Sequence, residues 1–72
     1  MTKQGIEYLE GVYANCVRRG RQYGEKRKEG NLGAAMAEIG YNQQRDLIEA
    51  IAQFERFPLP DHDAIFGKEA TQ

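Results

Sequence analysis

Cysteine, histidine and long apolar runs are nearly absent from this 72-residue sequence. One cysteine excludes an internal disulfide, and Cys16 with His62 gives too few soft ligands for a structural zinc site. We therefore expect no metal and no cofactor. No apolar run approaches the roughly 20 residues that a membrane-spanning helix needs, and the N-terminus lacks the apolar core of a signal peptide. The sequence predicts a cytoplasmic protein that does not contact a membrane.

An excess of charge of either sign is also missing. Lys and Arg number 10 against 11 for Asp and Glu, which gives a net charge of −1. This balance argues against a general polyanion binder and against an acidic disordered tail.

The length of the chain limits the core that it can form. A single domain of this size rarely gains more than ~3–5 kcal/mol from its core, and small chains compensate with disulfides, metals or oligomerisation. Because the first two are excluded, we expect self-association or a permanent partner. The chain is also shorter than the scaffold that most enzymes place behind a pocket of ~300 Å³ or more, so we expect no enzymatic activity. A nucleophile–base pair of Cys16 and His62 is disfavoured, since a cysteine within a helical seam usually packs as a small hydrophobe.

Spacings of three and four residues predict two helices, over about 3–29 and 32–56. Thr2 and Asn31 are suited to their N-caps, and Gly30 to the end of the first helix. Pro58 ends the second helix, because the residue before a proline is disfavoured in the α region. The expected fold is all-α: one domain over 1–72 that forms an antiparallel helical hairpin. A Pro-containing extended tail, 57–72, is expected to dock on the hairpin or on a neighbouring subunit.

We expect the hairpin to close through two facing seams. One consists of Ile6, Leu9, Tyr13, Cys16, Gly20, Tyr23 and Arg27, and the other of Leu32, Met36, Gly40, Gln43, Leu47, Ala50 and Phe54. Antiparallel pairing then places Tyr23 over Gly40 and Tyr13 over Ala50, so that each ring meets a small residue.

Apolar residues outside the seams predict an interface between subunits. A two-helix chain would leave such flanks in water, and contiguous apolar patches usually mark interfaces. The simplest closure is a twofold dimer that forms a four-helix bundle, with higher oligomers as the alternative. The candidate interface residues are Tyr8, Val12, Ile48, Ile51, Phe57 and Phe66.

The most distinctive feature of the sequence is a basic cluster between residues 18 and 28. Arg19, Gln22, Tyr23 and Lys26 share one flank and are candidates for binding a phosphorylated ligand, with Tyr23 available to stack on a base. Arg18, Arg21 and Lys28 point outward and are candidates for contacts with nucleic acid or an acidic protein. The simpler interpretation is a solvated helix end whose cations complement the helix dipole.

These features favour a non-enzymatic, oligomeric helical protein that binds or occludes a partner protein. Small helical chains with leftover apolar flanks are similar in general character to accessory or inhibitor proteins of phages and bacteria, which bind and block a host protein. The alternative is sequestration of a phosphorylated small molecule or nucleotide at a basic site between subunits. Nucleic-acid binding through the outward arginines ranks lower. No catalytic or metal-binding residues are expected.

Overall fold

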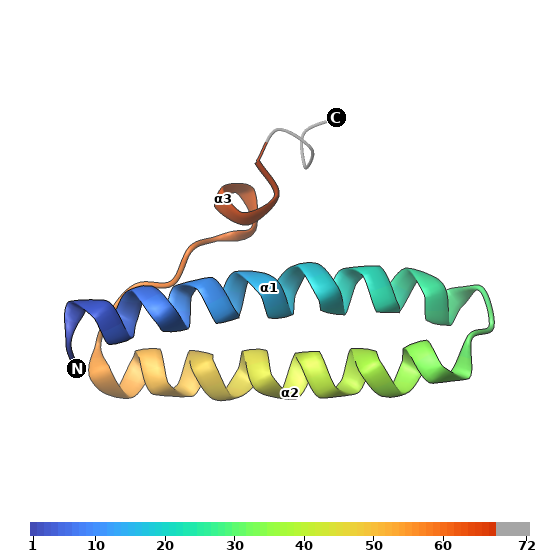
Figure 1. Ribbon diagram of the computed structural model, residues 1–72, viewed down its shortest axis with the longest axis horizontal. Coiled ribbons are helices and arrows are strands. Elements are labelled where there is room, and N and C mark those ends of the chain that lie inside the picture. The colour runs from blue at the N-terminus through green and yellow to red at the C-terminus, as the bar shows by residue number, and fades with distance from the viewer. Residues whose placement is uncertain (68–72) are drawn as a thin grey trace.

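The computed structural model describes residues 1–67, which form three helices and no strand. Helix α1 spans Lys3–Lys28, α2 spans Leu32–Glu55 and the short α3 spans His62–Phe66. Helices α1 and α2 run antiparallel along their whole length (Figure 1). The predicted all-α hairpin is thereby confirmed, with bounds within one residue of those expected. Residues 68–72 of the predicted tail lie outside the described part.

Local capping explains where each helix begins. The side chains of Thr2, Asn31 and Asp61 accept hydrogen bonds from the backbone N–H three residues later, at 3.0, 3.0 and 2.8 Å. Each bond satisfies an N–H that has no partner within the helix. Helix α1 is continuous through Gly20 and Gly24, and Gly30 follows it at φ 94°, a conformation that glycine adopts without strain.

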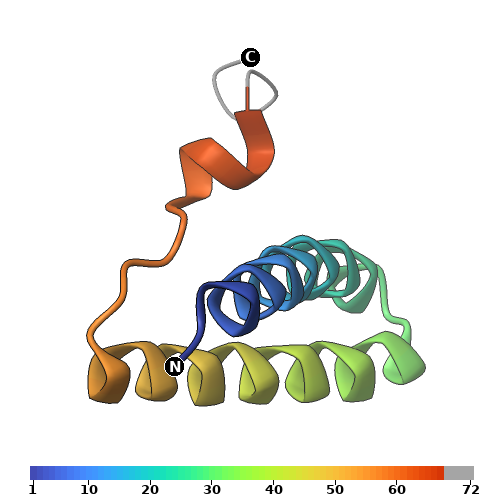
Figure 2. The ribbon, with the colours of Figure 1, turned by 60° about the vertical axis from the view of Figure 1, so that its left-hand side comes forward.

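The core is small, and α1 lies at its centre. Tyr13 and Val17 of α1, Ile48 of α2 and Ile65 of α3 form one buried cluster. Figures 1 and 2 show α3 on the far side of α1 from α2. Two faces of α1 are therefore covered, and α2 packs mainly against α1.

The rotation of α2 differs from the one predicted. The seam of α1 is correct in its central part, since Tyr13, Cys16 and Gly20 are buried. The prediction for α2 was wrong, because its buried residues are Ala34, Ile48 and Ala52. The predicted seam residues of α2 lie on the opposite, exposed side. Gly40 is exposed with no heavy atom within 4 Å of a Cβ built on it, and Tyr23 instead stacks on Tyr41 with ring centroids 5.8 Å apart.

Close approach at two glycines accounts for this rotation. A Cβ added to Gly20 would lie 2.8 Å from Asn42 Oδ1, and one added to Gly24 would lie 2.7 Å from Glu38 Oε2. Polar side chains of α2 thus occupy the space left by absent side chains on α1. Glu38 also accepts a hydrogen bond from Arg27 Nε and forms an ion pair with it. At this end the helices therefore meet through small and polar residues, whereas Ile48 of α2 packs in the apolar cluster with Tyr13 and Val17. Five other large apolar side chains of α2 face outward.

The glycine contacts yield a stability test with a matched control on the same helix. Gly20→Leu is expected to destabilise the chain by ~1–3 kcal/mol, because the new side chain must displace Asn42. Gly11 is exposed with no atom within 4 Å of a built Cβ, so Gly11→Leu is expected to stabilise α1 by up to ~1 kcal/mol through helix propensity. Urea unfolding of both variants measures the two effects. Equal effects of the two substitutions would contradict the packing described here.

Candidate functional site

The outer face of α2 carries a row of seven exposed side chains, six of them apolar. We call this row the outer stripe; it consists of Leu32, Met36, Ile39, Gln43, Leu47, Ala50 and Phe54. The five large apolar members are 53–85% exposed. At 3.6 residues per turn, all seven fall within about 40° of one line along the helix. Ala34 and Ala52 lie on the opposite side of α2, against α1, so the stripe points away from the rest of the hairpin.

The outer stripe is too extended to be an ordinary scatter of surface residues. From Leu32 to Phe54 it runs the length of a helix that rises about 1.5 Å per residue, which makes it about 33 Å long. Single exposed apolar side chains are common on protein surfaces, whereas a row of five large ones along one helix is not. In Figures 1 and 2 no other part of the described chain covers this side of α2.

The six residues predicted to form the subunit interface have divergent environments. Tyr8 is exposed, and Ile51 and Phe57 are half-buried. Ile48 is buried within the chain, in one cluster with Tyr13 and Ile65, so it offers little surface to a partner. Val12 and Phe66 pack against the same cluster. This exposed apolar surface was not predicted from the sequence, because all of its residues except Ile39 were assigned to the contact between α1 and α2.

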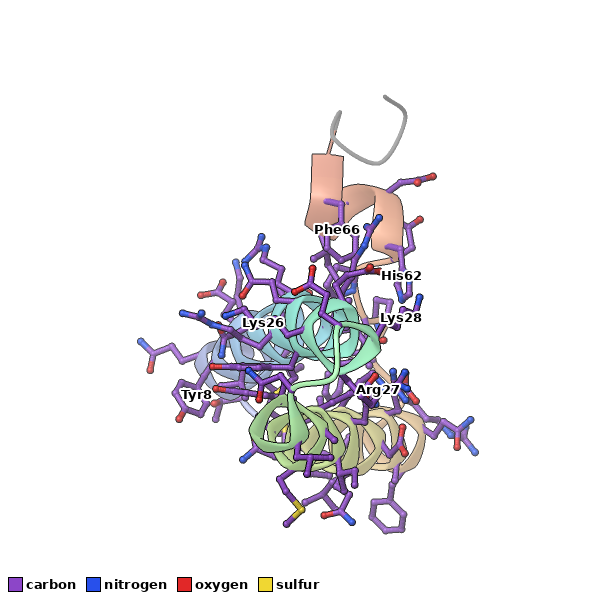
Figure 3. All side chains as sticks on the ribbon, turned by 90° about the vertical axis from the view of Figure 1, so that its right-hand side faces the viewer. Tyr8, Lys26, Arg27, Lys28, His62 and Phe66 are labelled. Atoms are coloured by element: carbon purple, nitrogen blue, oxygen red, sulfur yellow. The ribbon has the colours of Figure 1, made fainter. Side chains whose placement is uncertain are left out.

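The structure brings together the four candidate ligand-binding residues in two pairs on one flank of α1. Arg19 Nη1 donates to Gln22 Oε1 at 3.3 Å, and Lys26 Nζ lies 5.3 Å from the centroid of the Tyr23 ring. The Tyr23 ring is already stacked against Tyr41, so one of its faces is occupied. Figure 3 shows Tyr8 and Lys26 on one side of the hairpin and Arg27 with His62 on the other.

Two of the three outward cations contact α3. Arg18 Nη2 donates to the Ile65 carbonyl at 3.1 Å, and the Arg21 guanidinium lies 4.6 Å from the centroid of the Phe66 ring. Lys28 forms an ion pair of 3.7 Å with Glu25 on its own helix. All three side chains are exposed, but Arg18 and Arg21 hold α3 in place. An open pocket of about 410 Å³ lies beside them, lined by Arg18, Arg21, Gln22, Glu25, Ile65 and Phe66.

The buried polar side chains are bonded within the hairpin. Tyr13 donates its hydroxyl to Glu49 Oε2 at 2.9 Å, and Cys16 Sγ donates to Gln44 Oε1 at 3.3 Å. Burial raises the pKa of the Cys16 thiol, and burial together with the bond to Glu49 raises the pKa of the Tyr13 hydroxyl. His62 instead contacts the edge of Phe66. The structure therefore gives Cys16 a packing role and does not pair it with His62.

Two further features are absent from residues 1–67. That part of the chain holds no cluster of three or more His, Cys, Asp or Glu side chains placed to bind a metal ion. None of its helices combines the length and the apolar character that crossing a membrane requires. Comparison of the chain with protein-family models, with curated proteins and with solved structures finds no match in any of the three.

The Tyr13–Glu49 hydrogen bond predicts how stability depends on alkaline pH. The pKa of Tyr13 in the folded state is raised above 10.0. The protonated hydroxyl therefore contributes fully to the free energy of unfolding below about pH 10, and this contribution is lost as the pH rises through the folded-state pKa. Tyr13→Phe should lower the free energy of unfolding by ~0.5–1.5 kcal/mol near neutral pH. Above pH 10, the stability of this variant should decline less steeply than that of the wild type. Urea unfolding at several pH values measures this, with exposed Tyr8→Phe as the control. Parallel alkaline losses for wild type and Tyr13→Phe would refute the assignment.

Proposed function

We propose that this chain is a non-enzymatic, oligomeric helical protein that acts by binding another protein surface through the outer stripe of α2. The observation that carries the proposal is the exposure of five large apolar side chains along one face of a 24-residue helix. Apolar anchors at such spacings are the means by which an amphipathic helix docks into a groove or against a second helix.

The free energy available from burial favours the outer stripe over the basic cluster of α1 as the binding surface. Full burial of a Leu, Met, Ile or Phe side chain is worth ~1.5–3 kcal/mol. Burying the five large side chains of the stripe therefore contributes at least as much free energy as the ~3–5 kcal/mol that a core of this size supplies. The cations of α1 are largely exposed and partly used by Glu38, Ile65 and Phe66, so each adds little to binding a protein.

The absence of an enzymatic role is also part of the proposal. Shifted pKa values are typical of catalytic sites, but those of Tyr13 and Cys16 follow from burial between α1 and α2. Neither residue lines the pocket between α1 and α3.

Site-specific photo-crosslinking tests the proposal. A benzophenone amino acid at Met36 should form adducts in cells, whereas the same group at exposed Asn15 of α1 should not. Adding Leu47→Glu and Phe54→Glu to the Met36 variant should weaken the association by more than about 100-fold, because two buried anchors are lost. Helicity by circular dichroism should be unchanged, since both side chains are exposed. Equal adduct yields from Met36 and Asn15, or yields insensitive to the two glutamates, would overturn the proposal.

A second candidate function is binding of a phosphorylated small molecule in the pocket between α1 and α3. It is favoured by Arg18, Arg21 and Gln22, which place two guanidinium groups and an amide at the rim beside the Phe66 ring. Glu25 lines the same pocket and opposes an anion there, which ranks this function second.

A thermal-shift titration decides on this second candidate. If a nucleotide or sugar phosphate binds in the pocket, the melting temperature should rise with ligand concentration, and Arg21→Gln should remove most of the rise. Arg19→Gln, on another flank of α1, should leave the rise intact. A rise that both variants leave unchanged would exclude this pocket as the binding site.

A further inference from the structure

We infer that the occupant of the outer stripe is the same stripe of a second copy, packed antiparallel about a twofold axis beside Gln43. This inference rests on the proposed function, which assigns the stripe to protein binding, and it specifies the partner. Three features of the chain support this arrangement: the spacing of residues along α2, the distribution of charge along the hairpin and the size of the exposed face.

The stripe has an internal symmetry centred on Gln43. Ile39 and Leu47 lie four residues before and after it, Met36 and Ala50 lie seven residues away, and Leu32 and Phe54 lie eleven residues away. A twofold axis perpendicular to two antiparallel helices pairs each residue with the one equally distant on the other side of the centre. The axis therefore pairs Ile39 with Leu47, Met36 with Ala50 and Leu32 with Phe54, each twice.

The pairs that result are complementary. Long Met36 falls opposite small Ala50, which allows the two helix surfaces to interdigitate. The stripe has one polar member, and the axis places it against itself: Gln43 meets Gln43 of the partner subunit. A side-chain amide both donates and accepts, so two amides related by a twofold axis can bond to each other. A single polar residue in an apolar helix interface commonly fixes register and orientation.

Charge favours the antiparallel over the parallel arrangement. In the half of the hairpin next to the loop, six basic side chains outnumber three acidic ones: Arg18, Arg19, Arg21, Lys26, Arg27 and Lys28 against Glu25, Glu29 and Glu38. At the opposite, open end the acidic side chains Glu7, Glu10, Asp46, Glu49 and Glu55 outnumber the basic side chains Lys3, Arg45 and Arg56. An antiparallel pair brings the basic end of each copy beside the acidic end of the other, whereas a parallel pair brings like ends together.

The face is large enough for a specific dimer. Five side chains that each bury roughly 100 Å² give about 500 Å² per copy and about 1,000 Å² for the pair, which is the lower limit for a specific interface. Because α3 packs on the far side of α1, it does not obstruct the approach of a second α2 (Figure 2). The resulting assembly has the two α2 helices at its centre and each α1 outside them.

Cysteine cross-linking tests both the partner and its orientation. In a Cys16→Ala background, Gln43→Cys should oxidise almost completely to a disulfide-linked dimer, because the twofold axis places the two thiols together. The wild-type background serves if Cys16→Ala impairs folding, since Cys16 is 1% exposed. Met36→Cys alone and Ala50→Cys alone should remain mostly unlinked, whereas a mixture of the two should cross-link. The control is Asn15→Cys on α1, which should also remain unlinked.

The outcomes separate this inference from the proposed function. Light scattering of the wild-type chain at tens of micromolar should give twice the 8.2 kDa mass of one chain. Linking of Met36→Cys to itself would show a parallel pair and overturn the arrangement. A monomeric mass without linking at Gln43→Cys would overturn the inference, and an adduct between Met36 and a different protein in cells would then leave the proposed function standing. A monomer without cysteine cross-links, together with no photo-crosslinked adduct at Met36, would overturn both the inference and the proposed function.

Discussion

The close approach of α1 and α2 at Gly20 and Gly24 is the constraint on which the rest of the structure depends. Neither glycine has a Cβ, and the side-chain ends of Asn42 and Glu38 of α2 take the space that a Cβ would fill there. This contact sets the rotation of α2 about its own axis. Once Ala34 and Ala52 face α1, helical geometry turns the opposite row of side chains outward.

The rotation of α2 decides which of its apolar side chains remain exposed. The described chain buries few large apolar side chains and leaves five of them exposed along one helix, so its own fold uses only part of its apolar surface. A second surface must cover the stripe for that free energy to be realised. The same helix thus supplies the contact that closes the hairpin on one face and, in our proposal, the surface that binds a partner on the other. The basic side chains of α1 contribute mainly within the chain, by holding α3 and by pairing with acidic neighbours.

Helix boundaries were predictable because they depend on residues close in sequence. Asn31 caps α2, Gly30 adopts a positive φ, and α2 ends before Pro58. The face that α2 turns toward α1 was not predictable from apolar spacing alone, because spacing identifies a stripe without showing what covers it. The glycines at 20 and 24, four residues apart, were the available signal for close helix contact. The roles of Arg18 and Arg21 were missed because they depend on where α3 docks, which involves residues far away in sequence.

Helix α2 turns five large apolar side chains away from α1, and we infer that they face a second copy. The most direct measurement is an isotope-filtered NMR experiment on a mixture of labelled and unlabelled chains, which detects only contacts between copies. The account predicts contacts between the Leu32 methyl groups of one copy and the Phe54 ring of the other, and between Ile39 and Leu47. Contacts of Leu47 or Phe54 with α1 of the same chain, and none between copies, would contradict it.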